Sequence, residues 1–189
     1  MNLPTGSEAL AGSGSHGDNC SCELSDNLEI LRRSPIFSGA PMEVLKLFAL
    51  LAGRMTFGKG DFIIRQGEPA DRAFLILRGE VAVFEKYKNN QFNLQSLGKM
   101  SFFGELTLLA RFNWFFSVQA RSDVELIALN RKSFQKVVTK FPDHQYMLTE
   151  RIVQLRIKRL ENQMHFLLDN IREDVLRGNA STSPQTMIA

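Results

Sequence analysis

The sequence predicts a mainly β fold with flanking α-helices, in which a compact β-barrel or sandwich is followed by one long helix. Between residues 55 and 129, short apolar stretches are separated by Gly, Asn or Asp, which is typical of successive antiparallel strands. From about residue 143, apolar residues instead recur at intervals of four and three, the period of a helix with one apolar face. A length of 189 residues allows one domain with a core plus appendages, and hardly a second.

Residues 1–24 are predicted to be a disordered arm. They are rich in Gly and Ser and show no apolar periodicity, so they cannot bury enough surface to offset the entropy lost on ordering. The arm holds the only two cysteines, Cys20 and Cys22. Their spacing defines no disulfide framework, and we interpret them as exposed reduced thiols.

Residues 25–142 form the predicted domain. One helical pattern begins at Ser25, and a second follows Pro41 and ends at Gly53. Residues 104–110 are predicted as a short helix among the strands, and another helix begins at Arg131. Seven stretches are predicted as strands: Met55–Phe57, Asp61–Ile64, Ala73–Arg78, Val81–Lys86, Phe92–Leu97, Ser117–Ala120 and Glu125–Asn130.

Residues 143–177 are predicted to be a long amphipathic helix, followed by a flexible polar tail at 178–189. The helix carries an apolar seam nearly three heptads long. The seam consists of Val153, Ile157, Leu160, Met164, Leu167 and Ile171.

Several functional classes are disfavoured. The longest apolar run, Leu47 to Ala52, is far shorter than the roughly 20 residues of a membrane-spanning helix, and no secretion signal is recognisable, so we expect a cytoplasmic protein without membrane contact. Two cysteines and three histidines make a metal site improbable. No P-loop, His-Glu-x-x-His or Gly-x-Ser-x-Gly motif occurs, and we therefore expect no enzyme and no catalytic residues.

Two segments resemble the cyclic nucleotide-binding domain family, which includes catabolite activator proteins and regulatory subunits of the cAMP-dependent kinase. The first runs from Lys59 to Glu68 (KGDFIIRQGE) and continues in Ala73 to Val81 (AFLILRGEV). The second, Phe103 to Leu109 (FGELTLL), resembles the start of the family's phosphate-binding cassette. The resemblance covers roughly residues 30–145 and implies a jelly-roll β-barrel with a long C-terminal dimerisation helix.

The resemblance also implies a ligand site. Glu105 matches the family's acidic residue, which accepts a hydrogen bond from the ribose hydroxyl, and the amides from Gly104 to Thr107 would face the phosphate. The candidate ligand-binding residues of this degenerate cassette are Phe103, Gly104, Glu105, Leu106, Thr107, Trp114, Phe115, Phe116 and Ser117.

The cassette departs from the family at its arginine. The family's Pro-Arg pair, whose guanidinium binds the cyclic phosphate, falls on Asn113-Trp114. Losing such a charge-assisted pair costs roughly 3–5 kcal/mol, about two to four decades of affinity, so we expect cAMP binding to be weakened or lost. Arg111 could substitute only if the loop were redrawn. Alternatively, Trp114 stacks on a base or another planar group, and the ligand is altered.

The long helix is the second functional clue. In the family the equivalent helix pairs with its two-fold mate, which implies that Val153 to Ile171 form dimer contacts; the alternative is that they pack on the chain's own barrel. Only 13 residues follow Leu176, so we expect no helix-turn-helix and no direct DNA readout. The basic residues Arg151, Arg156, Lys158 and Arg159 are interpreted as a solvated helix face rather than a phosphate-binding patch.

Together these observations favour a non-catalytic signalling or scaffold module that is homodimeric and binds a protein partner. It would have no cofactor, or only a cyclic nucleotide. The alternative is a sensor in which a cyclic nucleotide or cyclic dinucleotide at the cassette reorients the C-terminal helix.

Overall fold

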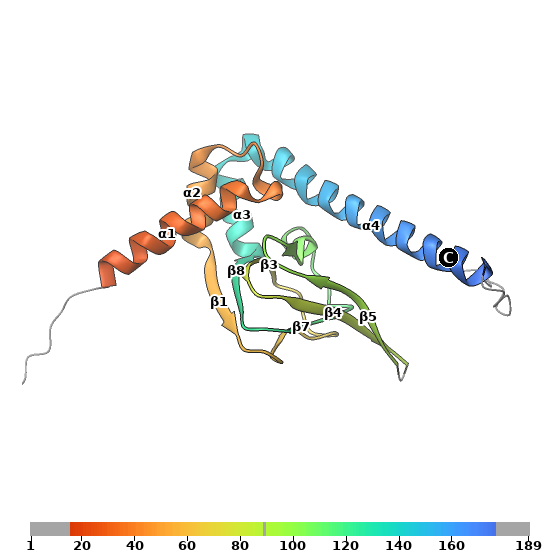
Figure 1. Ribbon diagram of the computed structural model, residues 1–189. Coiled ribbons are helices and arrows are strands. Elements are labelled where there is room, and N and C mark those ends of the chain that lie inside the picture. Colours follow the sequence, from red (N-terminus) through yellow and green to blue (C-terminus); the bar gives the residue numbers. More distant parts are fainter. Residues whose placement is uncertain (1–15, 89, 177–189) are drawn as a thin grey trace, which may run out of the picture.

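The computed structural model describes residues 16–88 and 90–176 and places helices around a strand-rich centre. Figure 1 shows α1 and α2 beside α3 at one end of the sheets, and α4 leaving that end along the sandwich. The helical elements are α1 (His16–Arg33), η1 (Pro35–Phe37), α2 (Met42–Leu51), η2 (Glu105–Leu108), α3 (Arg131–Lys140), η3 (Pro142–His144) and α4 (Gln145–Leu176).

In the part of the chain that the structure describes, eight strands form two antiparallel sheets of four. One sheet has the order β1-β8-β3-β6 and the other β2-β7-β4-β5. The strands are β1 (Gly53–Phe57), β2 (Phe62–Ile64), β3 (Arg72–Arg78), β4 (Val81–Tyr87), β5 (Asn90–Leu97), β6 (Phe102–Phe103), β7 (Ser117–Ala120) and β8 (Val124–Asn130). The predicted mainly β, jelly-roll-like fold is confirmed, although the two sheets face each other as a sandwich and do not close into a barrel.

Strand β3 contributes side chains to two hydrophobic cores, one on each face of its sheet. Successive side chains of a strand point to opposite faces of its sheet. Phe74 and Ile76 pack between the sheets with Val118 of β7, whereas Leu75 packs against the helices with Phe48 of α2. Because both faces of β3 are buried, the helices are fixed against the sheet and the start of α4 is fixed with them. Leu148 and Ile152 anchor α4 in the helical core.

The structure differs from the prediction at two places. Helix α1 begins at His16, so residues 16–24 are helical where a disordered arm was predicted, while residues 1–15 and the tail predicted at 178–189 lie outside the described residues. Leu31 is completely buried and anchors α1, and an anchored helix extends at low cost because each added residue gains one backbone hydrogen bond. Strand β6 was not predicted, since two residues are too few to show alternation.

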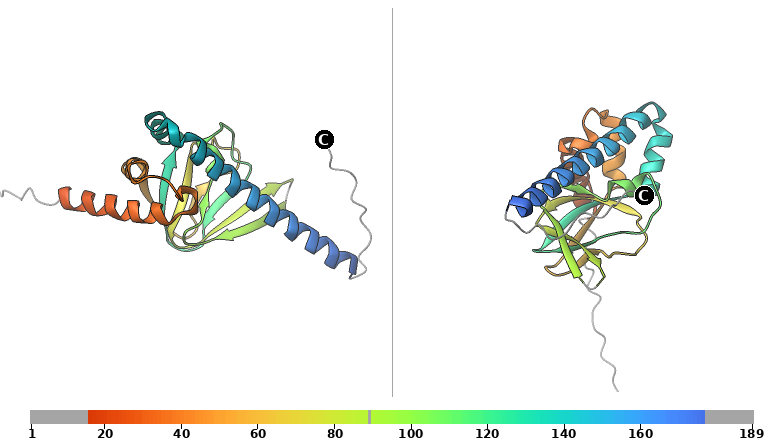
Figure 2. Two further views of the ribbon diagram at one scale, coloured as in Figure 1. Left: turned by 90° about the horizontal axis from the view of Figure 1, so that it is seen from above. Right: turned by 90° about the vertical axis from the view of Figure 1, so that its right-hand side faces the viewer.

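Helix α4 extends well beyond Leu148 and Ile152, which pack in the helical core. The two views in Figure 2 agree that it runs beside the sandwich and projects beyond the sheets. Of the helices that the structure describes, none combines the length and apolar character needed to cross a membrane.

Candidate ligand-binding site

Hydrogen bonds from the start of α3 fix the backbone of the segment between β6 and β7. Gly104 adopts a left-handed conformation with φ of 75°, and the 3-10 helix η2 follows it. The Thr107 hydroxyl donates a hydrogen bond of 2.8 Å to the Gly104 carbonyl. Arg131, at the start of α3, donates from Nε to the Thr107 carbonyl at 2.6 Å and from Nη2 to the Ala110 carbonyl. The cassette backbone is therefore shaped by groups outside the pocket.

Trp114 lies directly on Gly104. A Cβ at position 104 would lie 2.8 Å from the Trp114 Cη2 atom and 3.1 Å from the Arg72 carbonyl, so no other side chain fits there without displacement. Trp114 is only 5% exposed. Its backbone is fixed on both sides, since Gly67 N–H donates to the Trp114 carbonyl at 2.6 Å and Trp114 N–H donates to the Glu68 carbonyl at 2.9 Å.

Trp114 is the centre of an aromatic cluster. Its ring centroid lies 5.5 Å from that of Phe112 and 5.4 Å from that of Phe116, and Phe115 meets Phe116 edge-on at 4.9 Å. These separations are those of favourable aromatic pairs. Phe115 is nevertheless exposed, so the cluster continues from the core to the surface.

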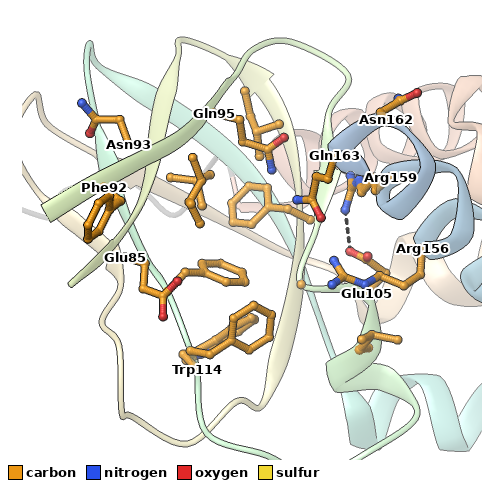
Figure 3. A pocket seen from close by; sticks show the side chains of 18 of the residues that line it. Glu85, Phe92, Asn93, Gln95, Glu105, Trp114, Arg156, Arg159, Asn162 and Gln163 are labelled. Carbon is orange, nitrogen blue, oxygen red and sulfur yellow. Dashed lines mark hydrogen bonds and ion pairs between the residues drawn. The ribbon is translucent and has the colours of Figure 1, made fainter. Parts of the chain in front are cut away.

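A cavity of about 660 Å³ opens above this cluster, between the β4–β5 hairpin and α4 (Figure 3). Such a volume is typical of small-molecule sites. Its lining consists of Val83, Glu85, Phe92, Asn93, Leu94, Gln95, Leu97, Phe103, Gly104, Glu105, Leu106, Phe112, Trp114, Phe115, Phe116, Arg156, Arg159, Asn162 and Gln163.

Glu105 is paired with an arginine from α4. Arg159 Nη1 lies 2.7 Å from Glu105 Oε2, and the two side chains are 20% and 4% exposed, respectively. Arg159 Nη2 also donates to the Phe102 carbonyl. A carboxylate this deeply buried needs a partner, and α4 provides it.

The interpretation of the basic stretch as a solvated face is wrong for three of its members, because Arg151, with its buried Nε atom, is half-buried like Arg156 and Arg159. Arg156 and Arg159 are half-buried and line the cavity, whereas Lys158 is exposed. The signal was present in the sequence, because Ile152, Arg156 and Arg159 follow each other at intervals of four and three and so share the helix face that Ile152 buries.

Seven of the nine predicted ligand-binding residues line one cavity. The two exceptions are Thr107, which is buried beneath Gly104, and Ser117, whose hydroxyl accepts a hydrogen bond of 3.0 Å from Gln66 N–H. Arg111 is exposed and lies outside the lining. The seven lining residues are Phe103, Gly104, Glu105, Leu106, Trp114, Phe115 and Phe116.

The predicted seam of α4 is solvent-exposed in the single chain. Val153, Ile157, Leu160 and Met164 are 42%, 50%, 46% and 59% exposed, so these four do not pack on the chain's own sandwich. The side chains of Leu167 and Ile171 lie outside the described residues.

Comparisons with known proteins agree with this geometry. Residues 54–141 match the family model of the cyclic nucleotide-binding domain. Over 148 residues the chain is 24% identical to a CRP-like cAMP-activated global transcriptional regulator of Mycobacterium tuberculosis, covering 78% of this chain and 64% of the regulator. Over 132 residues it is 30% identical to human cGMP-dependent protein kinase 2, covering 68% of this chain and 17% of the kinase.

Among solved structures, the catabolite activator protein of Thermus thermophilus superposes with a TM-score of 0.62 at 26% identity. The match covers 74% of this chain and 63% of that one. The chain thus spans less than two thirds of the length of each of these three proteins.

Proposed function

Residues 54–141 belong to the cyclic nucleotide-binding domain family, and we propose from this premise that the chain is a non-catalytic signalling or scaffold module whose pocket binds cAMP weakly or not at all. Domains of this family are regulatory parts of larger systems, and the relatives named above are a transcriptional regulator and a kinase. The module would pass its signal through α4.

The observation that carries the proposal is the position of Trp114. Its indole covers Gly104, at the cassette where the family's arginine would pair with the cyclic phosphate. An indole N–H is one neutral donor, whereas a guanidinium offers a charge and a bidentate fork. The loss of that pairing supports an affinity for cAMP lower by about two to four decades.

The ion pair of Glu105 supports the same conclusion. A ribose hydroxyl would have to compete with Arg159, whose guanidinium already holds the Glu105 carboxylate at 2.7 Å. An incoming nucleotide would meet a carboxylate that is already paired through Oε2 and whose charge Arg159 already balances.

The exposed seam of α4 supports pairing with a second copy. Four apolar side chains along one stripe of a helix leave a surface that water solvates poorly and that a matching helix can cover. We expect a homodimer through α4, with the rest of the surface available to a protein partner.

Calorimetric titration with cAMP and cGMP tests the ligand part of this proposal. Wild-type protein should give no saturable heat up to about 1 mM nucleotide, because no cation of the cassette meets the phosphate. A Trp114→Arg variant that remains folded should bind cAMP at least tenfold more tightly than the wild type, because it restores the charge-assisted pair. Micromolar binding by the wild type would contradict the proposal and favour the sensor alternative.

A further inference from the structure

The wall of the cavity against the sheets is mainly apolar and aromatic, and its polar members are Glu85, Asn93 and Gln95. Aromatic faces offer large contact area to flat apolar groups and little to a hydroxylated sugar. The six aromatic side chains that line the cavity are Phe92, Phe103, Phe112, Trp114, Phe115 and Phe116.

Charge is distributed unevenly across the cavity. On the α4 side stand Arg156, Arg159 and Glu105, so that two guanidiniums face one carboxylate. Arg159 is paired with Glu105, while Arg156 takes part in no ion pair within residues 16–88 and 90–176. The excess on this side is one positive charge, in a half-buried setting where solvent screens it less than at the surface.

The opposite side of the cavity, at β4, carries a negative charge. Glu85 extends from β4 next to Phe92 and, as Figure 3 shows, lies across the aromatic floor from Arg156 and Arg159. A ligand with one negative charge would be repelled at the β4 side and attracted at the α4 side. The amide side chains of Asn162 and Gln163 add hydrogen-bond donors beside the arginines.

We infer that the cavity binds an amphiphilic monoanion, with a flat apolar body on the Trp114 cluster and its anionic group on Arg156 of α4. The inference concerns the same pocket as the proposed function and rests on its loss of cAMP binding. It assigns anion recognition to the long helix and not to the cassette, so that occupancy acts directly on the element that carries the exposed seam.

The chain offers an internal reporter for this binding. Trp114 is its only tryptophan and lies in the cavity, so tryptophan fluorescence reports on this site alone. A suitable probe is 8-anilinonaphthalene-1-sulfonate, which has fused rings and one sulfonate; N-phenyl-1-naphthylamine has a similar apolar body without the charge. We expect the sulfonate probe to quench Trp114 with saturation at one per chain, and to bind about tenfold or more tightly than the neutral probe.

Variants of Arg156 and Lys158 test which side chain binds the anionic group of the probe. Arg156→Gln should weaken the sulfonate probe about tenfold and leave the neutral probe unchanged. Lys158→Gln removes the same charge from an exposed position of the same helix and should change neither. Arg156→Lys keeps the positive charge and should lose less affinity for the sulfonate probe than Arg156→Gln. It therefore still tests the role of the charge if Arg156→Gln does not fold.

Equal losses for Arg156→Gln and Lys158→Gln would overturn the inference, as would binding without saturation or without Trp114 quenching. Competition with cAMP separates this inference from the proposed function. Displacement of the probe by micromolar cAMP would refute the proposed loss of cAMP binding, whereas the variant comparison would still decide whether Arg156 holds the anion.

Discussion

The contact between Gly104 and Trp114 is the residue-scale feature on which the site depends. Counting from Phe103 along the sequence assigns Trp114 to the family's arginine position, and this assignment stays a prediction. The contact itself was not predictable, because it requires the left-handed backbone at Gly104 and a loop geometry that brings the Trp114 Cη2 atom within 2.8 Å of the place where a Cβ at position 104 would lie.

We predict that Gly104→Ala destabilises the protein by about 2–4 kcal/mol, since it adds left-handed backbone strain to a steric clash with Trp114. Urea unfolding measures the change. Gly98→Ala is the matched control, because its Cβ would meet nothing within 4 Å and its φ is not positive, and it should lie within about 0.5 kcal/mol of the wild type. Similar losses for both variants would show that Trp114 does not confine position 104.

At the scale of elements, the side chains of α4 lie in three different environments. Leu148 and Ile152 anchor the helix in the core, Arg156 and Arg159 continue the face of Ile152 along the cavity, and a separate stripe that includes Leu160 is exposed. The sequence predicted this exposed stripe, because its apolar residues recur at intervals of four and three. The spacing of Arg156 and Arg159 from Ile152 was also visible in the sequence, but the partner of Arg159 was not predictable, because a charged side chain looks the same in sequence whether it faces water or a partner 54 residues away.

A double-mutant cycle tests the ion pair that ties α4 to η2. Arg159→Met should cost about 2–4 kcal/mol, because it leaves the buried Glu105 carboxylate without a cation, and adding Glu105→Gln should recover part of this loss. The matched control is the exposed pair Glu29–Arg33, whose 2.9 Å contact lies within α1 and should show a coupling of only about 0.3–0.5 kcal/mol. Equal coupling energies for the two pairs would contradict a structural role of Arg159 at the pocket.

For the whole molecule, strand periodicity together with the family resemblance was enough to predict the fold, whereas contacts between elements were not predictable. Each of the seven predicted strands overlaps a strand of the structure, because alternation at half-buried positions survives in the sequence. What the sequence left open was the choice between a barrel and a sandwich, and it did not indicate the start of α1 at His16. These depend on tertiary packing between distant segments.

The most direct test of the proposed module is its mass in solution, since α4 can pass a signal to a second copy only if the exposed stripe pairs. Light scattering should give the wild-type chain twice its 21.4 kDa, and Leu160→Glu should reduce it to the single-chain mass by placing a charge in the stripe. Lys158→Glu changes an exposed residue off the stripe and should leave the dimer intact. A wild-type mass of 21.4 kDa, or an unchanged dimer in Leu160→Glu, would contradict pairing through α4.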